Sequence, residues 1–122
     1  MSNSNLLVLI IEDDFQLGQI FSLALQDSFE IEIITDGEVA QTRLTEIAPA
    51  VIVLDLKLPH ISGASLLKQI RADKRLAKTK VIVATADPNQ APGVYDEADV
   101  VIVKPVNPIQ LREQVISLHN TP

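Results

Sequence analysis

The chain has 122 residues, 47% of them hydrophobic, and a formal net charge of −6; this size can bury the core of one compact domain over residues 1–122. The absence of cysteine excludes disulfides, thiolate catalysis and cysteine-based zinc sites, and the acidic balance argues against direct nucleic-acid binding. No apolar run approaches the ~20 residues that span a bilayer, and the first residues lack a basic secretion signal, so we expect a cytoplasmic protein without membrane contact.

Five short runs of β-branched and aliphatic residues predict strands. They cover residues 6–11, 31–34, 51–54, 81–84 and 100–103. Four of the runs are continuously apolar, which is typical of a parallel sheet with helices on both faces. The second run alternates with Glu30 and Glu32, which predicts a strand at the edge of the sheet.

Apolar residues at helical spacing lie between the strands, within residues 17–25, 39–47 and 66–70. A last helix is predicted after Asn107, because asparagine is a good cap and Pro108 suits the first turn. Strands that alternate with helices predict an open, doubly wound α/β sheet with right-handed crossovers.

The segment between the fourth and fifth predicted strands is an exception to this alternation. Pro88, Pro92 and Gly93 interrupt any helical pattern there. We therefore expect a short or degenerate fourth helix.

Polar side chains follow four of the predicted strands, at the ends where such sheets bind ligands. They are Glu12-Asp13-Asp14, Asp55, Thr85 and Lys104-Pro105. Each has an ordinary explanation when taken singly, since an aspartate can cap a helix and a lysine can be a surface charge. Gathered at one edge, however, three carboxylates would repel each other unless a cation or raised pKa values relieved them. Mg²⁺ suits a set of carboxylate oxygens without cysteine or histidine.

One segment resembles a known signature, the D-x-x-[ML]-P-x-x-[SDN]-G motif of receiver domains in two-component signalling. It reads Asp55-Leu56-Lys57-Leu58-Pro59-His60-Ile61-Ser62-Gly63. The resemblance includes the acidic pair Asp13-Asp14, the pair Thr85-Ala86 and the pair Lys104-Pro105, each after its strand. It spans nearly the whole chain.

The resemblance implies a flavodoxin-like (βα)5 fold with strand order 2-1-3-4-5. It implies that Asp55 takes a phosphoryl group from a phosphohistidine of a sensor histidine kinase or histidine phosphotransfer protein. By the same resemblance, Asp14 and Asp55 ligate Mg²⁺ through their side chains, Asp13 orients the ion partly through water, and the backbone carbonyl of Lys57 completes the set.

The family also assigns roles at the ends of the fourth and fifth strands. There, Lys104 places an ammonium near the phosphoryl oxygens and Thr85 donates a hydrogen bond to them. The Lys104–Pro105 peptide bond is cis in the family. Such a domain is a signalling switch rather than an enzyme with its own substrate.

Two features depart from the family pattern. Receiver domains usually carry an aromatic residue three positions before the lysine of the fifth strand, and Val101 stands there. A valine cannot make the same rotamer exchange, so the usual signal path of the family is not expected here. The second departure is the degenerate fourth helix, which is a common output surface in the family, so we expect an unusual partner surface or signalling through the first and last helices. Lys57 and Asp87 lie where the family positions the hydrolytic water, and they either tune phosphoryl lifetime or are ordinary exposed charges.

Three alternative functions use a similar sheet. A pseudo-receiver adaptor would bind a partner without being phosphorylated. Val101 favours this alternative, whereas the complete set of expected active-site residues argues against it. An aspartyl phosphatase would carry a second aspartate two residues after the nucleophile, where Lys57 stands. A flavin carrier would not place acidic residues where a phosphate binds. The sequence identifies neither the kinase nor the output partner, and it fits a stand-alone receiver or a piece of a longer protein.

Overall fold

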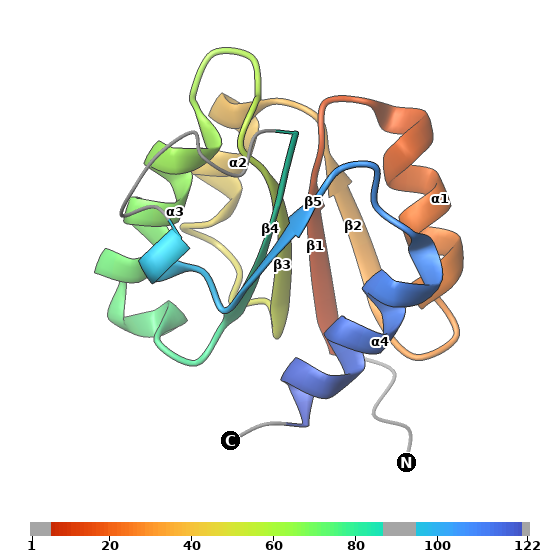
Figure 1. Cartoon of the computed structure of the whole chain (residues 1–122). Helices are drawn as coiled ribbons and strands as arrows, with labels where there is room; N and C mark the ends of the chain where they lie inside the picture. Colours follow the sequence, from red (N-terminus) through yellow and green to blue (C-terminus); the bar gives the residue numbers. More distant parts are fainter. Residues whose placement is uncertain (1–5, 87–94, 121–122) are drawn as a thin grey trace.

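The computed structural model describes residues 6–86 and 95–120 of the chain. Its strands form one parallel sheet of order β2-β1-β3-β4-β5 (Figure 1). In chain order they are β1 (Leu7–Ile11), β2 (Glu30–Ile34), β3 (Val51–Asp55), β4 (Lys80–Thr85) and β5 (Val100–Val103). The predicted flavodoxin-like fold and strand order are confirmed, and β2 lies at an edge of the sheet as predicted.

Helices cover both faces of the sheet, with α1 and α4 on one side and α2 and α3 on the other (Figure 1). The helices are α1 (Phe15–Leu25), α2 (Gly37–Arg43), α3 (Gly63–Ala72) and α4 (Pro108–His119), with short 3₁₀ turns η1 (Lys74–Leu76) and η2 (Tyr95–Glu97). Within residues 6–86 and 95–120, none of them combines the length and apolar character needed to cross a membrane.

The sheet separates two hydrophobic cores, because successive side chains of a strand point to opposite faces. In β1, Val8 and Ile10 belong to the core under α1 and α4, whereas Leu9 and Ile11 belong to the core under α2 and α3. All four side chains are fully buried. This double coverage explains the continuous apolar runs of the sequence, and it leaves the strand ends as the place for polar groups.

The start of α4 agrees with the sequence prediction. Asn107 Oδ1 accepts hydrogen bonds from the backbone N–H groups of Ile109 (2.8 Å) and Gln110 (3.2 Å), and Pro108 occupies the first turn. These bonds satisfy helix N–H groups that have no partner within the helix. The cap therefore fixes the path of the chain soon after it leaves β5.

The crossover from β4 to β5 is described only in part. Its described portion contains the single 3₁₀ turn η2, and the predicted helix breakers Pro88, Pro92 and Gly93 lie outside the described residues. The structure therefore tests the expected degenerate fourth helix only over the last residues of the crossover. These residues contain η2, which is one short turn.

Arg71 of α3 holds the described end of this crossover. Its guanidinium donates hydrogen bonds to the carbonyl of Glu97 (2.8 Å), the carbonyl of Thr79 (2.9 Å) and Asp99 Oδ2 (2.8 Å). The planar group with its fixed set of donors suits three acceptors at once. One side chain thus ties α3 to the segments that precede β4 and β5, at the amino-terminal edge of the sheet and away from the cavity at the carboxyl edge.

Gly63 begins α3 directly against the end of β3. A Cβ atom on this residue would lie 2.3 Å from the carbonyl oxygen of Asp55 and 2.5 Å from Leu56 Cα. Both atoms belong to the backbone and cannot turn aside. We expect Gly63→Ala to destabilise the fold by about 3 kcal/mol, the upper range for overpacking, measured by urea denaturation with circular dichroism.

Gly18→Ala in α1 is the matched control for this prediction. The atoms nearest to a Cβ atom there would belong to the side chain of Ile33, with Cγ2 at 3.0 Å. That side chain can shift, and alanine favours a helix over glycine by about 1 kcal/mol, so stability should change little. A Gly63→Ala protein as stable as wild type would contradict the close approach of α3 to β3.

Candidate functional site

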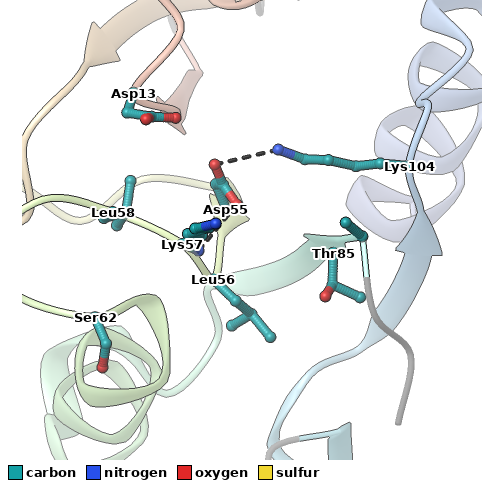
Figure 2. Close-up of a pocket in the computed structure, with 9 residues that line it drawn as sticks. Asp13, Asp55, Leu56, Lys57, Leu58, Ser62, Thr85 and Lys104 are labelled. Carbon is teal, nitrogen blue, oxygen red and sulfur yellow. Dashed lines mark hydrogen bonds and ion pairs between the residues drawn. The ribbon is translucent and has the colours of Figure 1, made fainter. Parts of the chain in front are cut away.

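A cavity of about 630 Å³ lies at the carboxyl edge of the sheet (Figure 2). The chain reaches it from the ends of several parallel strands, which is where such sheets bind ligands. The residues that line it are Asp13, Asp55, Leu56, Lys57, Leu58, Ser62, Thr85, Ala86 and Lys104. Five residues singled out in the sequence, Asp13, Asp55, Lys57, Thr85 and Lys104, are therefore brought together here.

Asp55 is the last residue of β3, and only 4% of its surface is exposed. Its Oδ1 accepts a hydrogen bond from the backbone N–H of Lys57 at 3.0 Å. Its Oδ2 lies 3.2 Å from Lys104 Nζ (Figure 2). The carboxylate is thus held from two sides while it lines the cavity.

Lys104 follows β5 and makes two ion pairs. Its Nζ lies 3.2 Å from Asp55 Oδ2 and 3.3 Å from Glu12 Oε1. Partial burial disfavours the ammonium, but the two carboxylates outweigh this effect and raise the pKa of Lys104 above its ordinary value. Lys104 is therefore a cation at neutral pH. Its peptide bond to Pro105 is cis, as the resemblance implied.

Glu12 completes the acidic group at the cavity. It is 3% exposed, and its Oε2 accepts a hydrogen bond from the backbone N–H of Asp14 at 3.2 Å. Burial raises the pKa of Glu12 to about 7. The hydrogen bond from the backbone of Asp14 favours the ionised carboxylate and partly offsets this rise. Carboxylate oxygens of Glu12, Asp13 and Asp55 lie within 4.8 Å of one another.

Asp14 has a different position from the one that the sequence analysis expected. Its Oδ1 accepts the backbone N–H of Leu17 at 3.2 Å and so caps α1. The acidic pair beside the cavity is Glu12 and Asp13, one residue earlier than the expected pair of Asp13 and Asp14. The physical reason is that β1 ends at Ile11 and α1 begins at Phe15, so Asp14 occupies the N-cap position of the helix. Metal ligation by the Asp14 side chain stays an untested prediction.

The signal for Glu12 was present in the sequence. Glu12 is the first residue after the apolar run of β1, and a strand end is where this fold places its ligand-binding groups. The expectation followed the adjacent aspartates instead. Glu12 was named among the polar residues at this strand end, but the expected metal ligands were Asp13 and Asp14.

Thr85 and Lys57 also line the cavity. Thr85 ends β4, is 2% exposed, and its carbonyl accepts the backbone N–H of Lys104 at 2.8 Å. This bond brings the ends of β4 and β5 together. The side chain of Lys57 is exposed, while its backbone N–H holds Asp55.

Comparison with known sequences places the chain in a family. The model of the response regulator receiver domain matches residues 8–116. The chain belongs to the response regulator receiver domain family. Receiver domains are signalling switches, and five strands in the order 2-1-3-4-5 agree with this assignment.

Two curated response regulators illustrate the similarity of this receiver domain in sequence. DNA-binding response regulator MtrA of Mycobacterium tuberculosis (strain H37Rv) is 29% identical over 109 residues, which are 88% of this chain and 48% of that protein. Phosphate regulon transcriptional regulatory protein PhoB of Rhizobium meliloti is 29% identical over 112 residues, 88% of this chain and 49% of that protein. The receiver domain spans about half the length of the curated relatives that it matches.

Solved structures show the same receiver fold. Response regulator TrrA from Thermotoga maritima, in complex with Mg²⁺-BeF, superposes with a TM-score of 0.82 at 27% identity and covers 93% of this chain and 98% of its own. Chemotaxis response regulator CheY4 of Vibrio cholerae gives a TM-score of 0.81 at 26% identity, again with 93% and 98% covered.

Val101 is the main departure of this receiver domain from the family pattern. Its side chain is partly buried and packs against the core under α2 and α3. The aromatic side chain that the family carries there can turn between two positions, whereas a valine has one preferred rotamer and little reach. The position therefore offers no large group that could move in response to Thr85.

Proposed function

We propose that this receiver domain is a phosphorylation switch in which Asp55 accepts a phosphoryl group from a phosphohistidine. The donor is a sensor histidine kinase or a histidine phosphotransfer protein. The observation that carries the proposal is the position of Asp55, a buried strand end whose carboxylate lines a cavity beside the ammonium of Lys104. Membership of the family supports it, as does the Mg²⁺-BeF complex of TrrA, a structural relative.

The acidic residues of the cavity fit a Mg²⁺ ion. Three carboxyl groups face a single ammonium, so negative charge is in excess even with Glu12 half protonated near pH 7. Carboxylate and backbone oxygens are the ligands that Mg²⁺ prefers. We propose Asp13, Asp55 and the backbone carbonyl of Lys57 as its protein ligands, with Glu12 acting through water. When bound, Mg²⁺ neutralises charge on the phosphoryl oxygens.

The transfer joins a carboxylate oxygen of Asp55 to phosphorus and breaks the bond from phosphorus to the imidazole nitrogen of the donor. That nitrogen keeps the electron pair of the broken bond. Such transfers depend mainly on positioning and charge stabilisation. The backbone N–H of Lys57 orients Asp55, the ammonium of Lys104 pairs with the phosphoryl oxygens, and the hydroxyl of Thr85 donates a hydrogen bond to one of them.

Incubation with acetyl phosphate and Mg²⁺ tests the proposal without knowledge of the kinase. We expect the wild-type protein to gain one phosphoryl group, measured by intact-protein mass spectrometry. Removal of Mg²⁺ with EDTA should abolish the gain, because the acidic cluster then repels the phosphate, and excess Mg²⁺ should restore it. The alternative, an adaptor that works without phosphorylation, predicts no gain in any of these conditions, and that result would overturn the proposal.

A further inference from the structure

His60 lies in the loop between β3 and α3 and has a backbone conformation that is rare outside glycine. Its φ is +72°. The backbone N–H of Ile61 donates to the carbonyl of Pro59 at 2.9 Å, which closes a tight γ-turn around His60. A turn of this kind is strained for a residue with a side chain, and it persists only where the surroundings hold it.

The side chain of His60 is bound by the loop between β2 and α2. Its Nδ1 lies 2.7 Å from Asp36 Oδ2. The other oxygen of Asp36 accepts the backbone N–H groups of Glu38 (2.7 Å) and Val39 (3.4 Å) and thereby caps α2. Loss of water opposes the ionised form of Asp36, but the bonds from His60 and from the cap outweigh it and lower the pKa of Asp36.

The two loops also meet through their backbones. The N–H of Gly37 donates to the carbonyl of Pro59 at 3.2 Å. A Cβ atom on Gly37 would lie 2.3 Å from the carbonyl oxygen of Ile61, so only glycine permits this approach. The pair of His60 and Asp36 is therefore the side-chain part of a close contact between the loops.

The β3–α3 loop forms one wall of the cavity. Four of its residues line it, namely Leu56, Lys57, Leu58 and Ser62. His60 lies between the two halves of this wall. At the base of the loop, the N–H of Gly63 donates to the carbonyl of Leu56 at 3.0 Å. The base is thus closed by its own backbone, while the tip is held by contacts to the β2–α2 loop.

We propose that His60 is a positioning residue whose pair with Asp36 holds the β3–α3 loop in the arrangement that phosphoryl transfer to Asp55 requires. The inference rests on the proposed function. The connection runs through Lys57, whose backbone N–H holds Asp55 at 3.0 Å and whose position depends on the loop. A loop released at its tip would spend part of its time with Lys57 displaced, and small displacements of positioned groups slow a reaction.

His60→Gly is the primary test. Glycine adopts a positive φ without strain, so the substitution removes the imidazole and keeps the turn. The His60 side of the pair with Asp36 is exposed to solvent, and exposed ion pairs contribute little free energy to the structure that they hold. We expect the rate of phosphorylation at saturating acetyl phosphate and Mg²⁺ to fall about two- to fivefold.

Asp36→Asn gives a second and independent variant. Asparagine caps helices as well as aspartate does, so the start of α2 is kept and only the charge facing His60 is lost. The rate should fall by the same factor. The double variant should be no slower than either single variant, because both substitutions remove one interaction.

Asp73→Asn is the matched control. Asp73 also caps a turn and pairs with a cation, Arg75 Nη2 at 2.9 Å, but at the opposite end of α3 from the cavity. The phosphorylation rate of the Asp73→Asn variant should equal that of wild type. Urea denaturation of each variant separates a change in rate from a change in folding.

Two results would overturn the inference while leaving the proposed function intact. One is a wild-type rate in His60→Gly, with or without lower stability, since that assigns the pair a structural role only. The other is a double variant whose loss is the product of the two single losses. If the wild-type protein itself gains no phosphoryl group, the proposed function fails and the inference fails with it.

Discussion

Asp55→Asn is expected to abolish phosphoryl acceptance from acetyl phosphate. An amide is a far weaker nucleophile than a carboxylate, and the substitution preserves the size of the side chain. The fold should be retained, because Asp55 Oδ1 accepts a backbone N–H that the amide oxygen can also accept. Intact-protein mass spectrometry should show one added phosphoryl group on wild type and none on the variant.

Asp27→Asn serves as the control for this experiment. Asp27 is exposed, follows the end of α1 at Leu25 and is not among the residues that line the cavity. Its variant should be phosphorylated like wild type. A phosphoryl group on the Asp55→Asn protein would show that another residue accepts it, and fragmentation of the modified protein would identify that residue.

The second large effect is expected at the acidic residues that follow β1. Asp13→Asn should weaken Mg²⁺ binding about 100-fold or more, because even the loss of a partner behind a metal ligand costs about 10- to 100-fold. Asp14→Asn should bind Mg²⁺ like wild type, since asparagine keeps the cap on α1. The chain has no tryptophan to report binding by fluorescence, so isothermal titration calorimetry is the suitable measurement.

The two substitutions change the same functional group in adjacent residues, so each is a control for the other. Charge is lost equally in both, and any general electrostatic effect on the cation should be shared. The opposite pattern, in which Asp14→Asn binds Mg²⁺ weakly and Asp13→Asn binds it like wild type, would contradict the proposed ligands. It would support the ligands expected from the sequence.

The fold was predictable because its signals are local and repeated. Continuous apolar runs separated by helical periodicity leave little choice but a parallel sheet covered on both faces. The alternation of Glu30 and Glu32 with apolar residues identified β2 as an edge strand, and Asn107 with Pro108 located the start of α4. Each of these features depends on residues that are neighbours in the sequence.

The sequence predicted which strand ends contribute to the site, but not the positions of the individual acidic residues that follow β1. Asp13, Asp55, Thr85 and Lys104 were found because each lies at a strand end. The positions of Glu12 near Asp55 and of Asp14 at the cap of α1 were harder to foresee, because they depend on where β1 stops, and a sequence defines element ends less sharply than their existence.

Contacts between distant loops gave no signal in the sequence. His60 and Asp36 are 24 residues apart, and neither belongs to a motif that predicts the other. The positive φ of His60 was not predicted either, because positive φ is uncommon for any residue other than glycine, even though histidine is among the residues enriched there. Arg71 is a similar case, because its three acceptors become neighbours only after β4 and β5 have paired.

The imbalance of charge around Lys104 has a thermodynamic consequence. Conversion of Asp55 to an acyl phosphate exchanges a monoanion for a group with about two negative charges at neutral pH. The excess negative charge, which the ammonium of Lys104 does not cancel, would then grow. The binding of a divalent cation would become more favourable. Linkage is reciprocal, so the modified protein should hold Mg²⁺ more tightly than the unmodified one by the factor with which Mg²⁺ favours the modification. The cellular supply of this ion would then be a second input to the same switch.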